Sequence, residues 1–211
     1  MNPRFKYPRT MHHPWSLGVA SDDKVIQTLD FLEGEEVVIT EKYDGECTTI
    51  ARDYTHARST DSGYHPSRTW IKKLHSEIGY LIPEDLRICG ENLYACHSIF
   101  YEDLLSYFYG FSVWRGSRSL AWDPTLEIFE KLGIIPVRTL YRGTFDHEVI
   151  IDLIENLDTE HQEGFVIRST GEIEYDDFSR LVCKWVRKGH VQTDEHWMHS
   201  EVKPNLLRKA V

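Results

Sequence analysis

The sequence is poor in the features that mark secreted, membrane and repeat proteins. Its four cysteines form no C-x-x-C pair, and so few thiols in 211 residues predict reduced cysteines in a cytoplasmic protein. No apolar run approaches the roughly 18 to 20 residues of a membrane span, so no membrane partner is expected. The basic N-terminus lacks the apolar stretch of a secretory signal. Without repeats or low-complexity linkers, we expect one domain over 1–211, with a core at about 24–190 and extensions 1–23 and 190–211 packed on it.

The charge is acidic overall but unevenly distributed. There are 24 Lys and Arg against 34 Asp and Glu, a net charge of −10. This balance argues against a protein that coats nucleic acid generally, because such proteins are usually basic. Positive residues nevertheless collect near the two ends, where one face could hold a polyanion. They are Arg4, Lys6 and Arg9, then Arg180, Lys184, Arg187, Lys188, Lys203, Arg208 and Lys209.

Hydrophobic patterning predicts many strands and a few helices. Residues 1–23 contain three prolines and are expected to be irregular. One helix has Asp123 as N-cap, Pro124 at the first helical position and Gly133 beyond its end, and Asp146 is expected to cap another. The mixture predicts an α+β fold with antiparallel sheets. Expected strands are 36–42, 47–53, 85–95, 106–114, 163–169 and 180–187, and expected helices are 68–81, 123–134 and 146–157.

Charged residues interrupt several of the predicted strands. Lys42 and Asp44 lie in a hairpin-like segment after the first strand, Glu91 is late in the third, Glu163 opens a later one, and Lys184 lies inside the last. A charge in an apolar strand is costly to bury unless it is paired or faces a ligand. These charges could therefore converge on one cleft. The simpler alternatives are a solvated turn for the first lysine, strand-end salt bridges for the glutamates and an edge position for the last lysine.

Five sequence elements stand in a recognisable order: K-Y-D-G at 42–45, G-E-N-L-Y at 90–94, Y-F-Y-G-F-S-V-W at 107–114, E-G-F-V-I-R-S at 163–169 and L-V-C-K-W-V-R at 181–187. Together they resemble the motifs of the covalent nucleotidyltransferase superfamily of ATP-dependent RNA ligases, DNA ligases and mRNA capping enzymes. The chain looks most similar to RNA ligases, especially the stand-alone ligase-domain proteins of phages and bacteria. The resemblance implies a nucleotidyltransferase domain, an ATP-grasp-like ligase adenylation fold with antiparallel sheets flanked by helices.

The resemblance also implies roles for individual residues. Lys42 would attack ATP and carry AMP, AMP would pass to an RNA 5′-phosphate, and a 3′-hydroxyl would then seal the strand. Asp44 and Lys184 would share the catalytic work, with Phe111 stacked on adenine. Glu163 and Glu91 would hold Mg²⁺ (or Mn²⁺). The ATP-binding set implied is Glu41, Lys42, Gly45, Arg58, Glu91, Phe111, Glu163 and Lys184.

The match to the family pattern has departures. Cys47 stands where phage-type relatives have Asn, Val182 where many have Lys, Arg168 where motif IV often has Lys, and Ser112 where an acidic residue is common. About 25 residues follow the last motif, which leaves no room for an OB domain. A partner subunit supplying RNA binding would fit this short chain.

Other interpretations stay open at this point. A DNA ligase or a GTP-using capping enzyme would share the motifs, and a non-catalytic module could bind nucleotide or RNA ends. Phe111 could simply pack in a core, as strand aromatics usually do. His190, His196 and His199 with Cys183 could hold zinc, although their spacing matches no strong zinc signature. The paired His12 and His13 have no metal-ligand spacing to support them.

Overall fold

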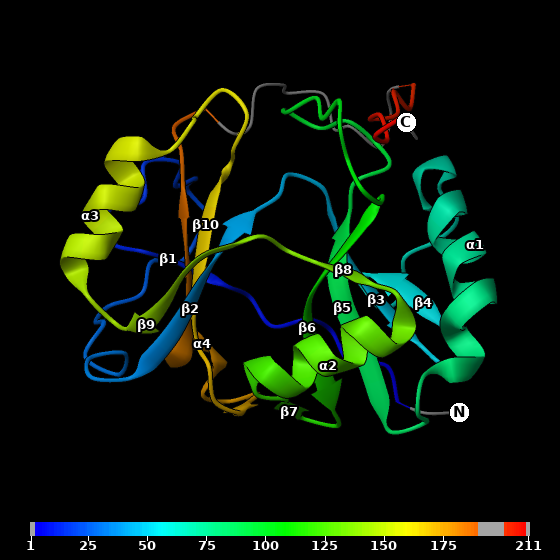
Figure 1. The fold of residues 1–211 in the computed structure, drawn as a ribbon, viewed down its shortest axis with the longest axis horizontal. Helices are drawn as coiled ribbons and strands as arrows, with labels where there is room; N and C mark the ends of the chain where they lie inside the picture. Colours follow the sequence, from blue (N-terminus) through cyan, green and yellow to red (C-terminus); the bar gives the residue numbers. More distant parts are fainter. Residues whose placement is uncertain (1–2, 190–200, 210–211) are drawn as a thin grey trace.

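The computed structural model describes residues 3–189 and 201–209, which form two β-sheets with helices around them (Figure 1). The five-stranded sheet has the order β1 (Met11–His12), β12 (Val182–Val186), β10 (Gly164–Ser169), β2 (Glu36–Lys42) and β9 (Thr139–Thr144). The seven-stranded sheet runs β11 (Ile173–Glu174), β7 (Arg118–Ser119), β6 (Phe108–Arg115), β5 (Leu86–Asn92), β3 (Glu46–Ala51) and β4 (Thr55–Ala57), with β8 (Ile135–Pro136) beside β6. Pairing is antiparallel except for β1–β12 and β6–β8, so the predicted α+β class with antiparallel sheets is confirmed.

Four α-helices flank these sheets: α1 (Thr69–Ile78), α2 (Trp122–Leu132), α3 (His147–Asn156) and the short α4 (Phe178–Leu181). Gly133 ends α2 in the left-handed region at φ 65°, as predicted. Asp146 caps α3 by accepting a hydrogen bond from the Glu148 amide, also as predicted. Asp123 is not an N-cap, because α2 begins one residue earlier and the Asp123 carboxylate instead pairs with Arg142 of β9 at 2.6 Å.

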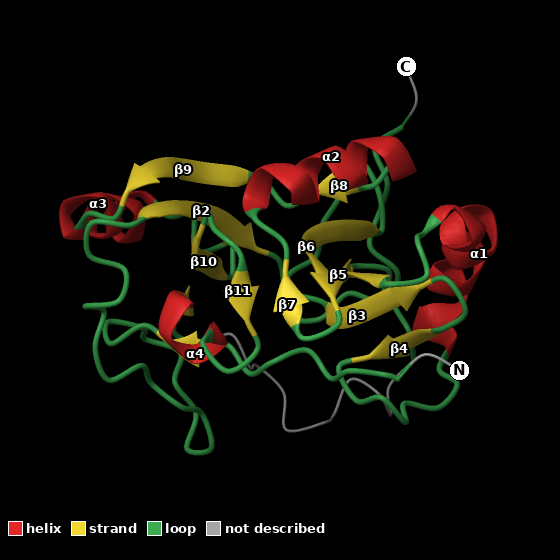
Figure 2. Cartoon of the chain, turned by 90° about the horizontal axis from the view of Figure 1, so that it is seen from below, coloured by secondary structure: helices red, strands yellow, loops and turns green. Residues whose placement is uncertain are grey.

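Each sheet has its own apolar core. In the five-stranded sheet, Phe165 stacks on Trp185 at 5.5 Å, and Ile150 of α3 is buried in the same cluster. In the seven-stranded sheet, β3 and β5 pack against α1 and α2 through buried residues such as Ile71 and Phe129. Figure 2 shows α1 and α3 at opposite ends of the molecule, with the strands of the two sheets between them.

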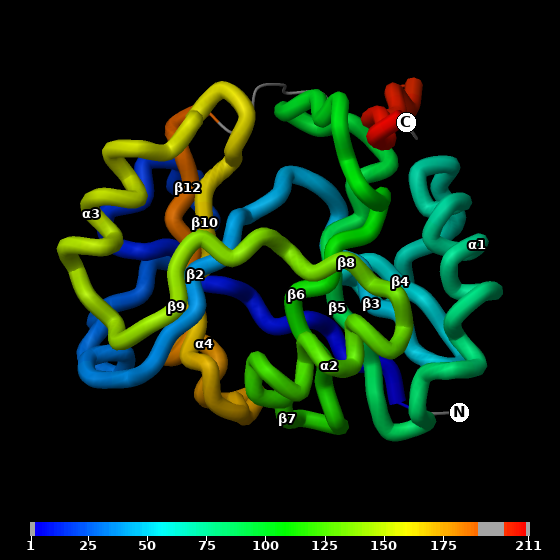
Figure 3. Tube along the Cα trace, viewed as in Figure 1, coloured from blue at the N-terminus to red at the C-terminus, as the bar shows by residue number. Residues whose placement is uncertain are grey.

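The segment after β2 crosses from one sheet to the other instead of closing a hairpin. β2 pairs with β10 and β9, whereas β3 pairs with β4 and β5, and the tube in Figure 3 follows the crossing. The hairpin-like segment expected from the sequence is therefore a bridge between sheets. Gly45 is needed in it because a Cβ there would lie 2.5 Å from the Asn92 carbonyl oxygen.

The N-terminal segment is more ordered than its prolines suggest. In Figure 1 the dark-blue start of the chain runs from the side of α1, across the middle of the molecule, to β1. There Met11 and His12 extend the five-stranded sheet by pairing in parallel with Cys183 and Lys184. The expectation of an irregular segment is thus wrong at these two residues. Local patterning could not show this, because the pairing partner lies 172 residues away (183 − 11).

The C-terminal residues 201–209 dock on the loop that follows β5. Asn205 is fully buried; its side chain donates to the Leu93 carbonyl at 2.8 Å and accepts from the Tyr101 amide at 3.0 Å. Arg208 pairs with Asp103 at 2.6 Å. All four cysteines are free thiols. Among residues 3–189 and 201–209, no helix is long and apolar enough to cross a membrane.

Candidate active site

A cavity of about 260 Å³ opens between the two sheets. One wall comes from β2, β10 and β12, and the other from β3, β5 and β6. Seven residues of the predicted ATP-binding set line it: Glu41, Lys42, Gly45, Arg58, Glu91, Phe111 and Lys184. The remaining member, Glu163, contacts the Lys42 side chain from the residue just before β10. The structure therefore brings the whole set to one place.

The register of the five-stranded sheet explains why one wall carries both lysines. Thr40, Val166 and Lys184 are direct neighbours across β2, β10 and β12, and all three line the cavity. Lys42 lies two residues beyond Thr40, so its side chain leaves the same face of β2. Opposite Lys42 is Gly164, where a Cβ would clash with the Trp185 carbonyl oxygen of β12.

Lys42 forms an ion pair and hydrogen bond with Glu163, whose side chain is buried. Burial alone would lower the pKa of Lys42, but the negative charges of Glu163 and Glu91 outweigh it and raise that pKa. The pKa of the Glu163 carboxyl is also raised, because burial opposes its charge more than Lys42 favours it. In the protein alone, the Lys42 amine is therefore held as an ammonium ion.

Glu91 and Lys184 complete the charged part of the cavity. Burial raises the pKa of Glu91 to about 8, against the attraction of Lys42 and with added repulsion from Glu163. Burial and the positive charge of Lys42 lower the pKa of Lys184. Two carboxylates and two lysines thus influence one another's pKa values. A bound cation or anion would shift these values strongly.

Asp44 holds the crossing segment from one side. Its carboxylate accepts hydrogen bonds from the Ser98 amide and hydroxyl, both at 2.7 Å, and from the Ile99 amide at 3.1 Å. The Asp44 amide donates to the Tyr101 hydroxyl at 3.0 Å. Asp44 does not line the cavity. This geometry favours a positioning role over the direct catalytic role expected from the sequence.

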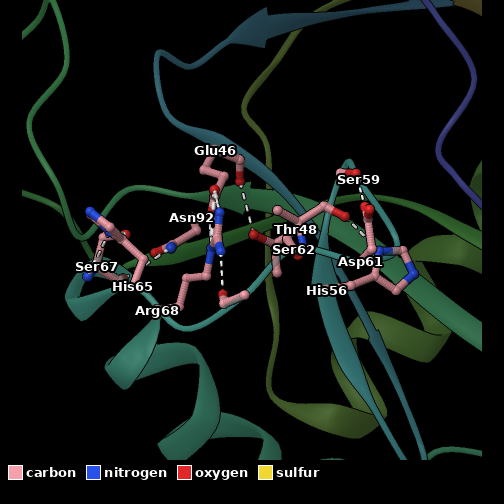
Figure 4. Close-up of polar contacts among 12 residues, drawn as sticks. Glu46, Thr48, His56, Ser59, Asp61, Ser62, His65, Ser67, Arg68 and Asn92 are labelled. Atoms are coloured by element: carbon pink, nitrogen blue, oxygen red, sulfur yellow. Dashed lines mark hydrogen bonds and ion pairs between the residues drawn. The ribbon is translucent and has the colours of Figure 1, made fainter. Parts of the chain in front are cut away.

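Glu46 holds the other side of the same segment (Figure 4). Its carboxylate takes a bidentate contact from the Arg68 guanidinium, whose Nε lies 2.8 Å from Oε2. Arg68 also donates to the Gly63 carbonyl at 2.6 Å, and Asn92 ties β5 to the Ser67 carbonyl at 3.1 Å. The segment after Lys42 is therefore held by the loop that follows β5, through Asp44, and by the turn before α1, through Glu46. Sequence reasoning missed this clamp, although the acidic residue directly after K-x-D-G was a visible signal.

Phe111 reaches the cavity through a β-bulge in β6. Gly110 pairs with Gly90 and Ser112 pairs with Cys89, so Phe111 is the extra residue between them. Bulges redirect side chains and are common beside active sites. The Phe111 and Tyr7 rings make a T-shaped contact, with 5.1 Å between their centroids. The Phe111 side chain is half-buried at the cavity wall. It is thus placed where a flat apolar ligand could contact it.

The positions that depart from the family pattern have local explanations. Arg168 is buried, donates to the Leu120 carbonyl at 3.1 Å and lies over the Trp122 ring, so its guanidinium is used within the protein. Buried Ser112 accepts from the Trp114 indole at 3.0 Å. Cys47 lines the cavity opposite Glu91 in the sheet, where burial raises the pKa of its thiol.

Several of the cavity residues that sequence reasoning missed come from the N-terminal segment. Tyr7, Arg9, Thr10 and Asp23 lie on its wall. Only the clustering of cations near the chain start hinted at this segment. His12 and His13 are fully buried against β12: the His12 ring lies 3.1 Å from Asp23, and the His13 amide donates to the Lys184 carbonyl at 2.7 Å.

A metal ion would find few protein ligands here. No group of three or more His, Cys, Asp or Glu side chains suited to a metal occurs in the described part of the chain. Glu163 and Glu91 are the carboxylates whose charges act most strongly on Lys42, and this pair fits Mg²⁺, which takes few carboxylates together with phosphate oxygens and water. The histidines of the zinc alternative, His190, His196 and His199, lie outside the described residues.

Solved structures with a similar fold are nucleic-acid ligases. An archaeal ATP-dependent RNA ligase (form 1) matches with a TM-score of 0.59 and 18% identity over 86% of this chain and 48% of its own. A putative ATP-dependent DNA ligase from Aquifex aeolicus matches with a TM-score of 0.55 and 20% identity, over 87% of this chain and 50% of its own. A Naegleria gruberi RNA ligase K326A mutant with ATP and Mn matches with a TM-score of 0.52 and 16% identity, over 87% of this chain and 61% of its own. At these identities the likeness establishes a shared fold.

This chain spans about half the length of those structures, or somewhat more for the Naegleria gruberi enzyme. No curated protein matches the sequence. The family model for RNA ligase matches residues 35–186, which begin just before β2, end with β12 and include every residue of the predicted site. The chain belongs to the RNA ligase family.

Proposed function

We propose that this protein is an ATP-dependent RNA ligase that uses Lys42 as the nucleophile that accepts AMP. The observation that carries the proposal is that Lys42, Glu91 and Lys184 line one cavity from strands of both sheets, while Glu163 pairs with Lys42. A solvated turn, the simpler alternative for Lys42, does not fit a lysine paired with a buried glutamate.

In the first step the Lys42 amine attacks the α-phosphorus of ATP. A nitrogen–phosphorus bond forms, the bond from that phosphorus to the bridging oxygen breaks, and pyrophosphate leaves with the electron pair. The ammonium proton must be lost before the attack and passes to water at the cavity mouth. Lys184, whose pKa is lowered by burial and by Lys42, supplies a positive charge for the phosphate.

The raised pKa of Lys42 explains why a divalent cation would be required. A bound Mg²⁺ or Mn²⁺ would offset the charges of Glu163 and Glu91, and those charges are what keep the amine protonated. The support for this site is a pair of carboxylates that repel each other: burial raises the pKa of Glu91 to about 8, and the charge of Glu163 adds to that rise. Phe111, Val137 and Val166 offer an apolar wall for adenine, and Arg58 offers a planar cation for a phosphate.

The later steps follow from the family. AMP would pass from Lys42 to an RNA 5′-phosphate, and a 3′-hydroxyl would then displace AMP and seal the strand. These steps also depend on positioning and charge stabilisation. Asp44 and Glu46 would contribute by holding the residues after Lys42 in place, through the loop that follows β5 and through Arg68.

The test is intact-mass measurement of the protein after incubation with ATP and Mg²⁺. The wild type should gain the mass of one AMP, and the adduct should be acid-labile. Lys42→Ala should gain nothing, whereas Lys131→Ala, on the exposed face of α2, should behave as wild type. A wild-type protein that binds ATP but acquires no adduct would make it a non-catalytic nucleotide-binding module.

Two further comparisons separate the related enzymes. Adduct formation from GTP in place of ATP would indicate a capping-type enzyme. Sealing of DNA ends but not RNA ends would indicate a DNA ligase, the description carried by one of the structurally similar proteins.

A further inference from the structure

The N-terminal segment alternates between anchored aromatic residues and exposed cations. Phe5 lies beneath the Arg87 guanidinium at 4.6 Å, and Tyr7 packs edge-on against Phe111 at 5.1 Å and Phe178 at 5.4 Å. The residues between and before them, Arg4 and Lys6, are exposed. The anchored, partly buried rings of Phe5 and Tyr7 thus alternate along the segment with the exposed cations Arg4 and Lys6.

These cations lie beside the loop that carries Arg58. Arg4 donates to the Thr60 carbonyl at 3.3 Å, and its guanidinium lies 5.3 Å from the centre of the Tyr54 ring. Lys6 is close enough to Asp61 to lower the pKa of that carboxyl, after the larger effect of the Ser59 hydrogen bond. At the inner end, Arg9 and Arg58 both line the cavity. A row of positive charge therefore runs from the cavity to the outer edge of the seven-stranded sheet.

Most of this charge is not neutralised within the protein. Among residues 3–189 and 201–209, Arg4, Lys6 and Arg58 have no carboxylate within 4 Å, although the chain carries a net charge of −10. Arg9 does pair with Asp22, at 3.6 Å. In an acidic protein, neighbouring cations left without partners raise the energy of the free state, and a polyanion would relieve that repulsion. Tyr54, half-exposed beneath Arg4, adds a ring on which a base could stack.

We propose that Arg4, Lys6 and Arg9 form a track that binds the RNA strand carrying the 5′-phosphate and leads that phosphate to the cavity. The inference rests on the proposed function, because the strand that must reach the AMP on Lys42 is the one with the 5′-phosphate. The segment from residue 4 to residue 9 spans at most about 17 Å, enough for a few nucleotides.

The first test measures binding of a 5′-phosphorylated single-stranded RNA as a function of salt, by fluorescence anisotropy. Arg4→Ala/Lys6→Ala should reduce the slope of log K against log salt by about 1.4, since each phosphate contact to a single strand contributes about 0.7. At 0.1 M salt the affinity should fall by about 10- to 30-fold. Arg4→Lys/Lys6→Arg, which keeps both charges, should bind as wild type.

The matched control removes two charges elsewhere. Lys73→Ala/Lys131→Ala changes exposed residues of α1 and α2, and should leave both slope and affinity unchanged. An equal loss in this control, or no loss in Arg4→Ala/Lys6→Ala, would overturn the track. Adduct formation with ATP needs no RNA, so Arg4→Ala/Lys6→Ala should retain it. If the wild type forms no AMP adduct but its RNA binding still depends on Arg4 and Lys6, the proposed ligase chemistry would be wrong while the track would stand.

The direction of the strand has its own test. A 4-thiouridine placed two or three nucleotides from the 5′-phosphate should crosslink to peptides within residues 3–10, detected by mass spectrometry. Crosslinks from that position to other parts of the chain, with residues 3–10 labelled only from the 3′ end, would show that the track holds the other strand.

Discussion

Replacing Glu91 with glutamine should stabilise the ligand-free protein at alkaline pH and leave it unchanged in acid. Burial raises the pKa of this carboxyl from 4.5 to about 8, against the attraction of Lys42. Between these values the unfolded chain has released the Glu91 proton while the folded protein still holds it. Stability therefore falls as pH rises through this window. Glutamine carries no such proton and no charge, so the variant should escape this loss.

The magnitude follows from the width of the window. A shift from 4.5 to about 8 is about 3.5 pH units, and at about 1.4 kcal/mol per unit the ceiling is about 5 kcal/mol. Glu91 is partly exposed, and solvent screening lowers the expected gain to about 2 kcal/mol. For a chain of this size, that gain corresponds to a rise in Tm of roughly 4–8 °C at pH 8.5.

The assay is thermal unfolding of wild type and Glu91→Gln at pH 5 and pH 8.5 without ligand. Glu155→Gln, which changes an exposed residue of α3, is the control and should show no pH-dependent difference from wild type. Mg²⁺ should then raise the Tm of the wild type more than that of Glu91→Gln. A Glu91→Gln protein that is no more stable than wild type at pH 8.5, or equally more stable at both pH values, would refute the reasoning.

Three other substitutions test the support of the site. Asn205→Ala should cost about 2–4 kcal/mol of unfolding free energy, measured by urea denaturation, because it leaves the Leu93 carbonyl and Tyr101 amide without partners. Glu46→Ala should cost about 3–5 kcal/mol by the same measurement, since it leaves the half-buried Arg68 guanidinium without its carboxylate partner. An unchanged urea midpoint would show that this ion pair does not stabilise the fold. Phe111→Ala should raise the KM for ATP in adduct formation at least tenfold, whereas Phe111→Tyr should stay within about twofold; equal KM values would mean that the ring only packs against Tyr7.

Much of the fold could be predicted because its signals are local. The apolar run of β2 and the spacing of α3 are readable in a short window, as is the turn at Gly133. Asp123 could not be read in this way, because its partner Arg142 comes from β9, a strand whose half-exposed residues T-L-Y-R-G-T give no alternation. The tertiary ion pair decided the role of that carboxylate.

The residues of the site likewise divide into those that a local sequence pattern predicts and those that it does not. The cavity residues carried by motifs were predicted because the chemistry requires particular residue types at fixed spacing, as with Lys42 and Gly45. Tyr7 and Arg9 were not, since they reach the cavity through a chain path that no local pattern encodes. The domain limits, the metal ligands and a partner subunit stay predictions.

The crossing between β2 and β3 has a consequence for how the amine is controlled. Glu163 adjoins β10, the strand paired with β2, so its distance from Lys42 is set within a single sheet. Glu91 belongs to β5 in the other sheet, and its distance from Lys42 depends on the angle at which the two halves stand. The basicity of the nucleophile therefore depends on how the two sheets are placed relative to each other. A larger distance between the sheets would weaken the effect of Glu91 on the amine, while that of Glu163 would stay in place.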